Sequence, residues 1–220
     1  MDSLKNKDFF SSWSGGKDSC LALYKAIRQG GRPRRLLTMF GDDGRRSKSH
    51  NLPPEVIAAQ AEALAIPSLI GSASWDGYEK IFLGYLGDLK KDGLVDGVFG
   101  DIDLVPHREW VERVCGEHDI MAHLPLWQEE RRTLLADFIE AGFKAVIVVV
   151  DEKRLDKSFL GRTLDWRTID DLEAAGADAC GEEGEYHTVV TGGPIFAHDL
   201  EVKYGKISQH EGYGFLDVSF

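Results

Sequence analysis

Six consecutive residues near the start of the chain, Ser14-Gly15-Gly16-Lys17-Asp18-Ser19, combine groups that bind phosphate. Glycine lets the backbone approach an anion closely, because no Cβ intervenes, and the N–H groups of such a turn and of a following helix point toward phosphate oxygens. Lys17 adds a positive charge, and Ser14 and Ser19 add hydroxyl donors. An ordinary strand-to-helix turn with a polar cap is the alternative, but the combination favours a phosphate site. The spacing is not that of a Walker A loop, GxxxxGK[ST].

A second group of reactive side chains lies within Cys180-Gly181-Glu182-Glu183-Gly184-Glu185-Tyr186-His187-Thr188. Ionisable residues bracketed by glycines are atypical of a core strand. The segment is either a solvated acidic turn or a set of carboxylates that binds a cationic group or ammonium, with His187 near the reacting centre. Cys180 could instead be a nucleophile for sulfur transfer, but no second cysteine is placed to assist it.

Arg45, Arg46, Lys48 and His50 form a third, basic group in a polar segment. Such a segment could be a solvated loop. It could also supply a mobile cation that closes over bound phosphates.

Short apolar runs that alternate with amphipathic stretches determine how these groups are positioned. Alternation of this kind predicts an α/β domain with a mostly parallel sheet and helices on both faces. The expected strands are 8–13, 36–40, 68–70, 95–99, 119–123 and 144–150, and the expected helices are 20–29, 54–64, 78–91, 108–118 and 131–141. The β-branched run 144–150 is typical of a buried parallel strand.

The carboxyl ends of parallel strands meet at one edge of a sheet, where ligands bind. The polar segments after Trp13, Phe40 and Phe99 are therefore expected to share one crevice. After residue 151 the pattern changes: glycines cluster, a helix is expected at 168–175, and strands are expected at 188–191, 200–207 and 215–219. The sequence thus predicts a nucleotide-binding domain over residues 1–150 and a smaller α+β, substrate-binding region over residues 151–220.

The charge of the chain argues against nucleic acid as a partner. The formal net charge is −11, and residues 151–220 contain 15 acidic and 7 basic side chains. Binding to nucleic acid depends on Lys and Arg that neutralise phosphates. Three distant cysteines without a CxxC predict reduced, buried thiols rather than a zinc or dithiol site. Apolar stretches are too short to span a membrane, and no secretory signal is visible, so we expect a cytoplasmic protein.

The segment SGGKDS after the first strand resembles the PP-loop ATP pyrophosphatases. The segment from Cys180 to Thr188, followed by Gly193-Pro194-Ile195-Phe196, resembles the GEGGE[FY]xT…GPxF signature of the diphthine–ammonia ligase family. Glu183 stands where that family usually has Gly or Asn, and the segments 47–53 and 100–103 look closer to its bacterial branch. The resemblance covers nearly the whole chain and implies a Rossmann-like, HUP-type fold.

The resemblance also implies roles for individual residues. The loop Ser14–Ser19 would hold the β- and γ-phosphates of ATP, with Lys17 and Asp18 acting in catalysis. Met39 and Phe40 would lie against adenine, and Gly100 and Asp101 would face the nucleotide or Mg²⁺, with Asp101 the expected metal ligand. His50 is assigned to the nucleotide. Glu185 and His187 are expected to be catalytic, and the residues expected on the substrate side are Glu182, Glu183, Gly184, Tyr186 and Thr188.

The function implied by the resemblance is an AMP-forming ligase of diphthamide biosynthesis. A substrate carboxylate would be adenylated with release of pyrophosphate, and ammonia would then displace AMP. The substrate would be diphthine-like, with diphthine on elongation factor 2 as the archaeal and eukaryotic case. Diphthine carries a quaternary ammonium, and aromatic faces and carboxylates such as Tyr186 and Glu185 hold such cations. A PP-loop enzyme that thiolates RNA and a nucleotide-binding regulatory module are the alternatives, and a homo-oligomer is compatible with the sequence.

Overall fold

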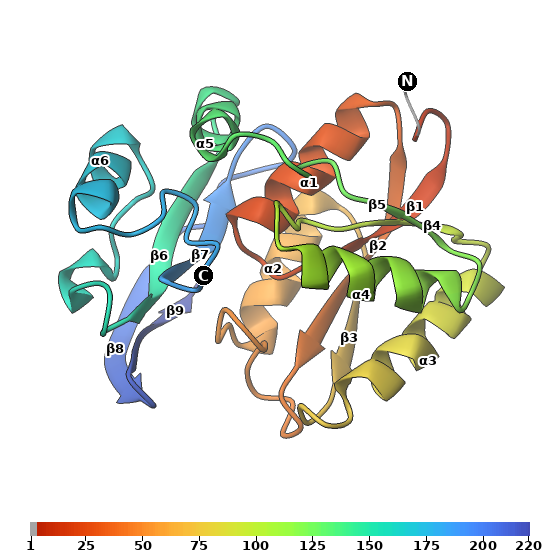
Figure 1. Cartoon of the computed structure of the whole chain (residues 1–220), viewed down its shortest axis with the longest axis horizontal. Helices are drawn as coiled ribbons and strands as arrows, with labels where there is room; N and C mark the ends of the chain where they lie inside the picture. The colour runs from red at the N-terminus through yellow and green to blue at the C-terminus, as the bar shows by residue number, and fades with distance from the viewer. Residues whose placement is uncertain (1–3) are drawn as a thin grey trace. The chain divides into compact units, whose positions relative to one another are not determined.

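The structure is a computed structural model that describes residues 4–220 (Figure 1). The strands are β1 (Asp8–Ser12), β2 (Arg32–Phe40), β3 (Ser68–Ser72), β4 (Asp96–Val98), β5 (Met121–His123), β6 (Lys144–Asp151), β7 (Tyr186–Gly192), β8 (Lys203–His210) and β9 (Tyr213–Ser219). The helices are α1 (Lys17–Arg28), α2 (Pro54–Leu64), α3 (Tyr78–Lys91), α4 (Val105–Gly116), α5 (Arg131–Glu140) and α6 (Trp166–Ala174), with a 3-10 turn, η1, at Lys157–Phe159.

The chain divides into two compact units that are not contiguous in sequence. Among the described residues, the first unit contains 4–14, 18–48 and 66–129, and the second contains 15–17, 49–65 and 130–220. This division differs from the predicted ranges 1–150 and 151–220, because residues 130–150 group with the C-terminal part. Three residues of the predicted phosphate loop and the whole of α2 also belong to the second unit.

The first unit is built on a five-stranded sheet with the order β3-β2-β1-β4-β5. Every pairing in this sheet is parallel. The Rossmann-like α/β fold predicted from the sequence is therefore confirmed. The chain builds outward from β1 to β3 on one side and then returns to β4 on the other. The order of the strands thus reverses between β1 and β4, which is where open α/β sheets bind ligands.

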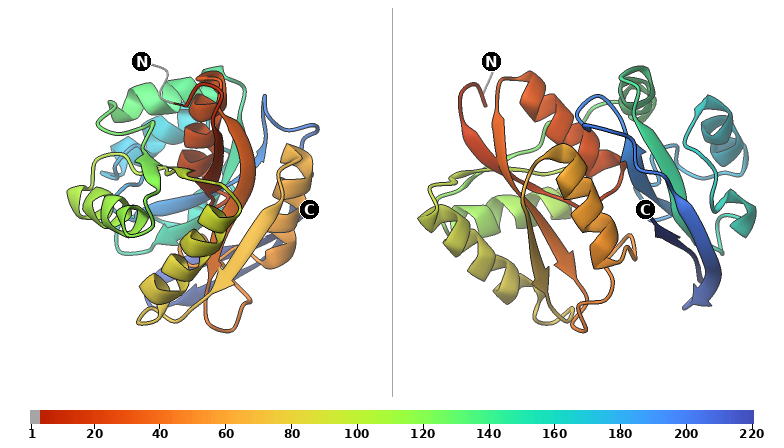
Figure 2. Two further views of the ribbon diagram at one scale, coloured as in Figure 1. Left: turned by 90° about the vertical axis from the view of Figure 1, so that its right-hand side faces the viewer. Right: turned by 180° about the vertical axis from the view of Figure 1, so that it is seen from behind.

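Apolar side chains of α3 and α4 provide much of the core of the first unit. The two helices pack against each other, and Figure 2 shows them from two further directions. Phe82, Leu86 and Leu89 recur at helical spacing on one side of α3 and are buried with Phe10 of β1. This packing fixes the sheet whose edge carries the candidate site.

The second unit is built on a four-stranded sheet with the order β7-β6-β9-β8. All pairings of β6 are antiparallel, so the parallel strand predicted at residues 144–150 is wrong in direction. The apolar run correctly indicated burial, because Ala145–Val150 are buried without interruption. Burial on both faces also occurs in a central antiparallel strand, and β6 lies between β7 and β9. Apolar composition therefore does not report the direction of a strand.

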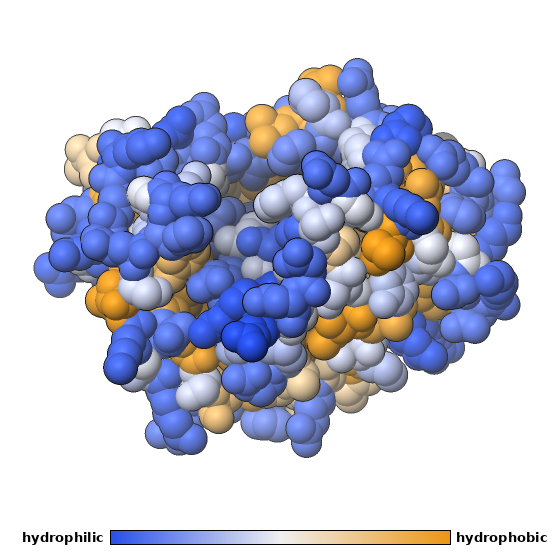
Figure 3. All heavy atoms as spheres, turned by 90° about the horizontal axis from the view of Figure 1, so that it is seen from below, coloured by the Kyte–Doolittle hydropathy of each residue, from blue (hydrophilic) through white to orange (hydrophobic). Residues whose placement is uncertain are grey.

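Polar residues predominate on the face of the molecule drawn in Figure 3. One face of the molecule shows hydrophilic residues with small, separate apolar patches (Figure 3). Within residues 4–220, no helix combines the length and the apolar character needed to cross a membrane. Cys20, Cys115 and Cys180 are buried and form no disulfide, as predicted. Burial raises the pKa of the Cys20 thiol and raises the pKa of Cys115 to about 12.

Candidate phosphate-binding site

The predicted phosphate loop lies between β1 and α1, and its ends are bonded to each other. The Ser14 N–H donates to Ser19 Oγ at 3.3 Å, and the two hydroxyl oxygens are 3.1 Å apart. Gly15 has a φ of 83°, a conformation that residues with side chains rarely adopt. Helix α1 begins at Lys17, so the positive end of its dipole lies at the loop. This arrangement has the chemistry of an anion site.

Both glycines of the loop lie close to neighbouring side chains. A Cβ on Gly15 would lie 2.8 Å from Gln60 Oε1 and 2.8 Å from Leu52 Cδ1. A Cβ on Gly16 would overlap the imidazole ring of His50. The basic segment predicted to close over phosphates therefore contributes His50 to the wall of the loop.

Strand β7 holds the centre of the loop through a set of hydrogen bonds. The Val190 N–H donates to Gly15 O at 2.9 Å, and the Lys17 N–H donates to Thr188 Oγ1 at 3.1 Å. The Gln60 amide group, on α2, donates to Gly15 O at 3.0 Å and to Val190 O at 2.7 Å. Thr188, predicted on the substrate side, is thus brought to the backbone of Lys17.

His50 and His187 form a pair beside this contact, with ring centroids 4.8 Å apart. His50 Nδ1 lies 2.7 Å from Thr188 O. A carbonyl oxygen only accepts, so we assign the proton to Nδ1 of His50. Burial, followed by the positive charges of His50 and Lys17, holds the pKa of His187 well below its usual value of 6.5. His187 is therefore a neutral imidazole at pH 7, and an unprotonated ring nitrogen can accept a hydrogen bond.

Lys17 and Tyr186 face each other inside the second unit. The Lys17 side chain is only 6% exposed, and its Nζ lies 5.3 Å from the centroid of the Tyr186 ring. The Tyr186 hydroxyl donates to Ala179 O at 2.5 Å, and the residue is 1% exposed. The aromatic face that the sequence assigned to a substrate cation thus faces an ammonium group of the chain itself.

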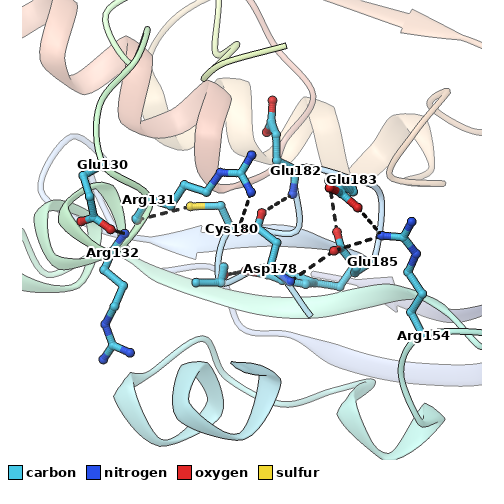
Figure 4. A network of polar contacts seen from close by, with 11 residues as sticks. Glu130, Arg131, Arg132, Arg154, Asp178, Cys180, Glu182, Glu183 and Glu185 are labelled. Atoms are coloured by element: carbon cyan, nitrogen blue, oxygen red, sulfur yellow. Dashed lines mark hydrogen bonds and ion pairs between the residues drawn. The ribbon is translucent and has the colours of Figure 1, made fainter. Parts of the chain in front are cut away.

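In the acidic segment Glu182–Glu185, the carboxylates of Glu183 and Glu185 bind groups of the second unit itself (Figure 4). Glu185 is buried and accepts hydrogen bonds from the N–H groups of Asp178 at 3.2 Å and Glu183 at 3.1 Å. Arg154 pairs with Glu185 at 3.2 Å and with Glu183 at 2.8 Å. Asp178 pairs with Arg131 at 2.9 Å. Glu185, predicted to be catalytic, is positioned to shape the loop that precedes β7.

Two further residues of this cluster can be placed. The Glu182 N–H donates to Asp178 Oδ2 at 2.8 Å, and in Figure 4 the Glu182 carboxylate points away from the network. Gly184 adopts a φ of 84°, which allows the turn between Glu183 and Glu185. Cys180 is buried, with its Sγ 3.4 Å from Arg131 O.

The remaining candidates lie in the first unit. A Cβ on Gly100 would be 2.9 Å from both Asp18 C and Ser19 N, so the segment after β4 touches the start of α1. Asp101 Oδ1 lies 3.5 Å from His107 Nδ1. The segment after β4 and the loop after β1 therefore lie at neighbouring strand ends of the parallel sheet, as the sequence predicted.

Met39 and Phe40, at the end of β2, are both buried. Their carbonyl oxygens accept backbone hydrogen bonds from Lys48 at 3.1 Å and Ala73 at 3.1 Å, respectively. Met39 belongs to the apolar core cluster of the first unit. Contact of these residues with adenine stays a prediction.

Sequence reasoning missed Gln60, Val190, Arg154 and Asp178. A signal existed for Gln60, because it shares the buried face of α2 with Val56 and Ile57, where a polar residue needs a partner. Arg154 and Asp178 gave no such signal, because surface segments routinely contain charged residues and their partners are distant in sequence.

A parallel α/β sheet with a glycine–lysine loop at the end of its central strand defines a nucleotide-binding class of protein. Residues 9–122 match the family described as diphthamide synthase N-terminal domain, and residues 130–219 match the diphthamide synthase C-terminal domain. The chain belongs to the diphthamide synthase family, as its two motifs predicted.

Several proteins of known description are similar to the chain. The diphthine–ammonia ligase of Rattus norvegicus is 27% identical, over 94% of this chain and 87% of the rat protein. That of Danio rerio is 26% identical, over 94% of this chain and 91% of its own length. That of Schizosaccharomyces pombe is 25% identical, over 90% of this chain but 36% of the yeast protein. A solved structure described as a predicted subunit of tRNA methyltransferase from Methanocaldococcus jannaschii has a TM-score of 0.46 and 18% identity, over 86% of this chain and 98% of that chain.

Proposed function

We propose that the protein is an ATP-dependent ligase that adenylates the carboxylate of a diphthine-like substrate and transfers ammonia to it. In the first step a carboxylate oxygen bonds to the α-phosphorus, and the bond to the β-phosphate breaks to release pyrophosphate. In the second step ammonia bonds to the acyl carbon, AMP leaves, and the extra proton of the nitrogen passes to a base. Membership of the family makes the chain a ligase of diphthamide biosynthesis; the adenylate route and its products are the proposal.

The observation that carries this proposal is the fit of the Ser14–Ser19 loop to a polyphosphate. The loop combines the positive φ of Gly15, the beginning of α1 and the buried ammonium of Lys17. Phosphate oxygens form strong, charge-assisted hydrogen bonds with an ammonium group, and burial reduces the competition from water. Lys17 would bind and orient the phosphates, and Asp18 would act beside them at the first turn of α1.

The nucleotide would extend along the strand ends of the first unit, with adenine near Met39 and Phe40. Mg²⁺ commonly takes one or two protein carboxylates together with phosphate oxygens. Within residues 4–220 no group of three or more His, Cys, Asp or Glu side chains forms a ready-made metal site. Asp101, at the end of β4, is the residue that would hold Mg²⁺ against the phosphates, where the ion would offset the charge of the leaving group.

The acceptor half of the reaction is assigned to the segment Glu182–His187. Glu182 would attract the ammonium that supplies the ammonia, because its carboxylate points away from the Glu185 network (Figure 4). His187 is a neutral imidazole at pH 7 because burial and nearby positive charges oppose its protonation. It would orient the adding ammonia as a hydrogen-bond acceptor, and the proton that the nitrogen loses would pass to water. Glu185 would hold this segment in place through Arg154 and through the backbone N–H groups of its loop.

Product analysis tests the proposal. With ATP–Mg²⁺, ammonium and elongation factor 2 carrying diphthine, we expect AMP and pyrophosphate in equal amounts. The amide product should form only when ammonium is present. Lys17→Ala should lose most turnover, because no other side chain supplies its charge inside the loop. Lys80→Ala, which removes an exposed lysine of α3, is the matched control and should behave as the wild type.

The formation of ADP and phosphate with the authentic substrate would contradict the assignment. Full turnover in Lys17→Ala would show that the loop is not the phosphate site. An RNA-thiolating enzyme would need an accessible thiol, whereas the three cysteines are buried. We place the reaction in the cytoplasm, with no nucleic acid among its partners.

A further inference from the structure

Two aromatic side chains near the end of β3 hold a cation on their faces. Trp75 lies in the loop between β3 and α3, and Tyr78 is the first residue of α3. Their rings are stacked, with centroids 6.3 Å apart. Lys48 Nζ lies 4.1 Å from the centroid of Trp75 and 5.9 Å from that of Tyr78. These distances are those of cation–π contacts.

Trp75 is exposed, while its neighbour is firmly held. Trp75 is 72% exposed, which is unusual for the largest apolar side chain. Tyr78 packs against Phe82 and Trp110 at 5.9 and 5.7 Å between centroids. The indole N–H of Trp110 in turn donates to Glu79 Oε2 at 2.7 Å. The Tyr78 ring is therefore held in place by its neighbours, whereas the Trp75 ring is open to a ligand from solvent.

The electrostatics around the pair favour a cation. The negative charge of Asp42 favours the protonated form of Lys48, and the negative charge of Asp101 favours the protonated form of Tyr78. Burial and the Asp101 charge raise the pKa of Tyr78 to about 12, so its ring is uncharged at pH 7. Burial lowers the pKa of Lys48. A small, strongly hydrated ammonium such as that of lysine gives up water for aromatic faces only reluctantly.

The pair lies where a substrate would meet the nucleotide. Lys48 follows β2, Trp75 follows β3 and Asp101 follows β4, and all three strands belong to one parallel sheet of the first unit. The segments that carry them leave the carboxyl edge of that sheet. Ligands of open α/β sheets bind at this edge.

We propose that Trp75 and Tyr78 form a binding site for the quaternary ammonium of the substrate, and that Lys48 occupies this site until the substrate displaces it. The identity of the ligand rests on the proposed function, since diphthine carries a quaternary ammonium and the carboxylate to be amidated in one side chain. A methylated ammonium is a poor partner for water and a good one for aromatic faces. Tyr186, the aromatic residue assigned to this cation from the sequence, is 1% exposed and already faces Lys17.

The site can be tested without ATP, and so without the reaction. The probe is choline, and its uncharged isostere 3,3-dimethylbutan-1-ol is the reference ligand. Binding to the full chain is measured by calorimetry or by ligand-observed NMR. We expect choline to bind at least about threefold more tightly than the isostere, because only the cation gains from the ring faces.

Two substitutions test the residues assigned to the site, and a third serves as the control. Trp75→Ala should weaken choline binding by at least about threefold, and it should fold, because the side chain is mostly exposed. Lys48→Gln should strengthen choline binding, because the competing ammonium is removed. Trp166→Ala is the matched control: Trp166 is 37% exposed and has Arg132 over its ring at 5.7 Å, but it lies in the second unit. It should bind choline as the wild type does.

Equal binding of choline and its isostere, or unchanged choline binding in Trp75→Ala, would overturn the site. Unchanged or weaker binding in Lys48→Gln would overturn the displacement of Lys48. In turnover with diphthine-bearing elongation factor 2, Trp75→Ala should raise the KM for that substrate and leave kcat and the KM for ATP nearly unchanged. If the wild type bound choline as expected but formed no AMP, the proposed function would fail and the quaternary-ammonium site would stand.

Discussion

At the scale of single residues, neighbouring glutamates of one loop have different environments. The side chain of Glu185 is 4% exposed and that of Glu183 is 59% exposed, although both pair with Arg154. Glu185 also accepts two backbone N–H groups. The sequence could indicate an unusual concentration of charge here. It could not tell the inward acid from the outward one, because that difference depends on where Asp178 and Arg154 lie in the fold.

The two glutamates give a matched pair of substitutions. Glu185→Gln should lower the free energy of unfolding by about 1–3 kcal/mol, because an amide NH₂ group would replace an oxygen that accepts hydrogen bonds in a buried setting. Glu183→Gln should cost less than about 1 kcal/mol, because it weakens only an exposed ion pair. Denaturant unfolding of both variants measures the difference. Equal effects would mean that Glu185 does not organise the loop.

At the scale of elements, close approach of two loop backbones controls the start of α1. A Cβ on Gly100 would meet the backbone of Asp18 and Ser19, which cannot move aside as a flexible side chain can. Gly100→Ala should therefore destabilise the protein by about 1–3 kcal/mol and weaken ATP–Mg²⁺ binding. A Cβ on Gly84, in α3, would have no neighbouring atom within 4 Å, and Gly84→Ala should stabilise by about 0.5–1 kcal/mol.

Thermal unfolding and nucleotide calorimetry of these two variants provide the check. A Gly100→Ala protein with wild-type stability and affinity would show that the segment after β4 can retreat from α1. The Gly84→Ala protein controls for the general effect of replacing a glycine.

Helix positions were the most predictable part of the fold. The ranges 54–64 and 78–91 agree with α2 and α3, because amphipathic spacing and flanking Pro or Gly are local signals. The direction of β6 was not predictable in this way. Its partners β7 and β9 follow it by more than thirty residues, and pairing over that separation depends on the whole second sheet.

At the scale of the whole molecule, the chain passes between its two units several times. The phosphate loop is itself divided, since Gly15–Lys17 group with β7 while Ser14 and Asp18 group with the parallel sheet. The sequence predicted both motifs but treated them as separate regions with separate tasks. Contacts between residues about 170 positions apart, such as Lys17 with Thr188, have no local signature.

This division leads to a prediction about a strand remote in sequence from the loop. Thr188→Val keeps the shape of the side chain but removes the oxygen that accepts the Lys17 N–H. We expect ATP–Mg²⁺ affinity to fall by up to about tenfold, which corresponds to about 1.4 kcal/mol, because the first turn of α1 loses an anchor.

Thr188→Ser, which restores the oxygen, should recover most of the affinity. Thr191→Val is the control on the same strand, since the Thr191 hydroxyl contacts Lys144 O at 3.4 Å and not the loop. Calorimetry with ATP–Mg²⁺ distinguishes the cases. If Thr188→Val bound ATP as the wild type does, the hydrogen bond from the Lys17 N–H to β7 would have no part in positioning the phosphates.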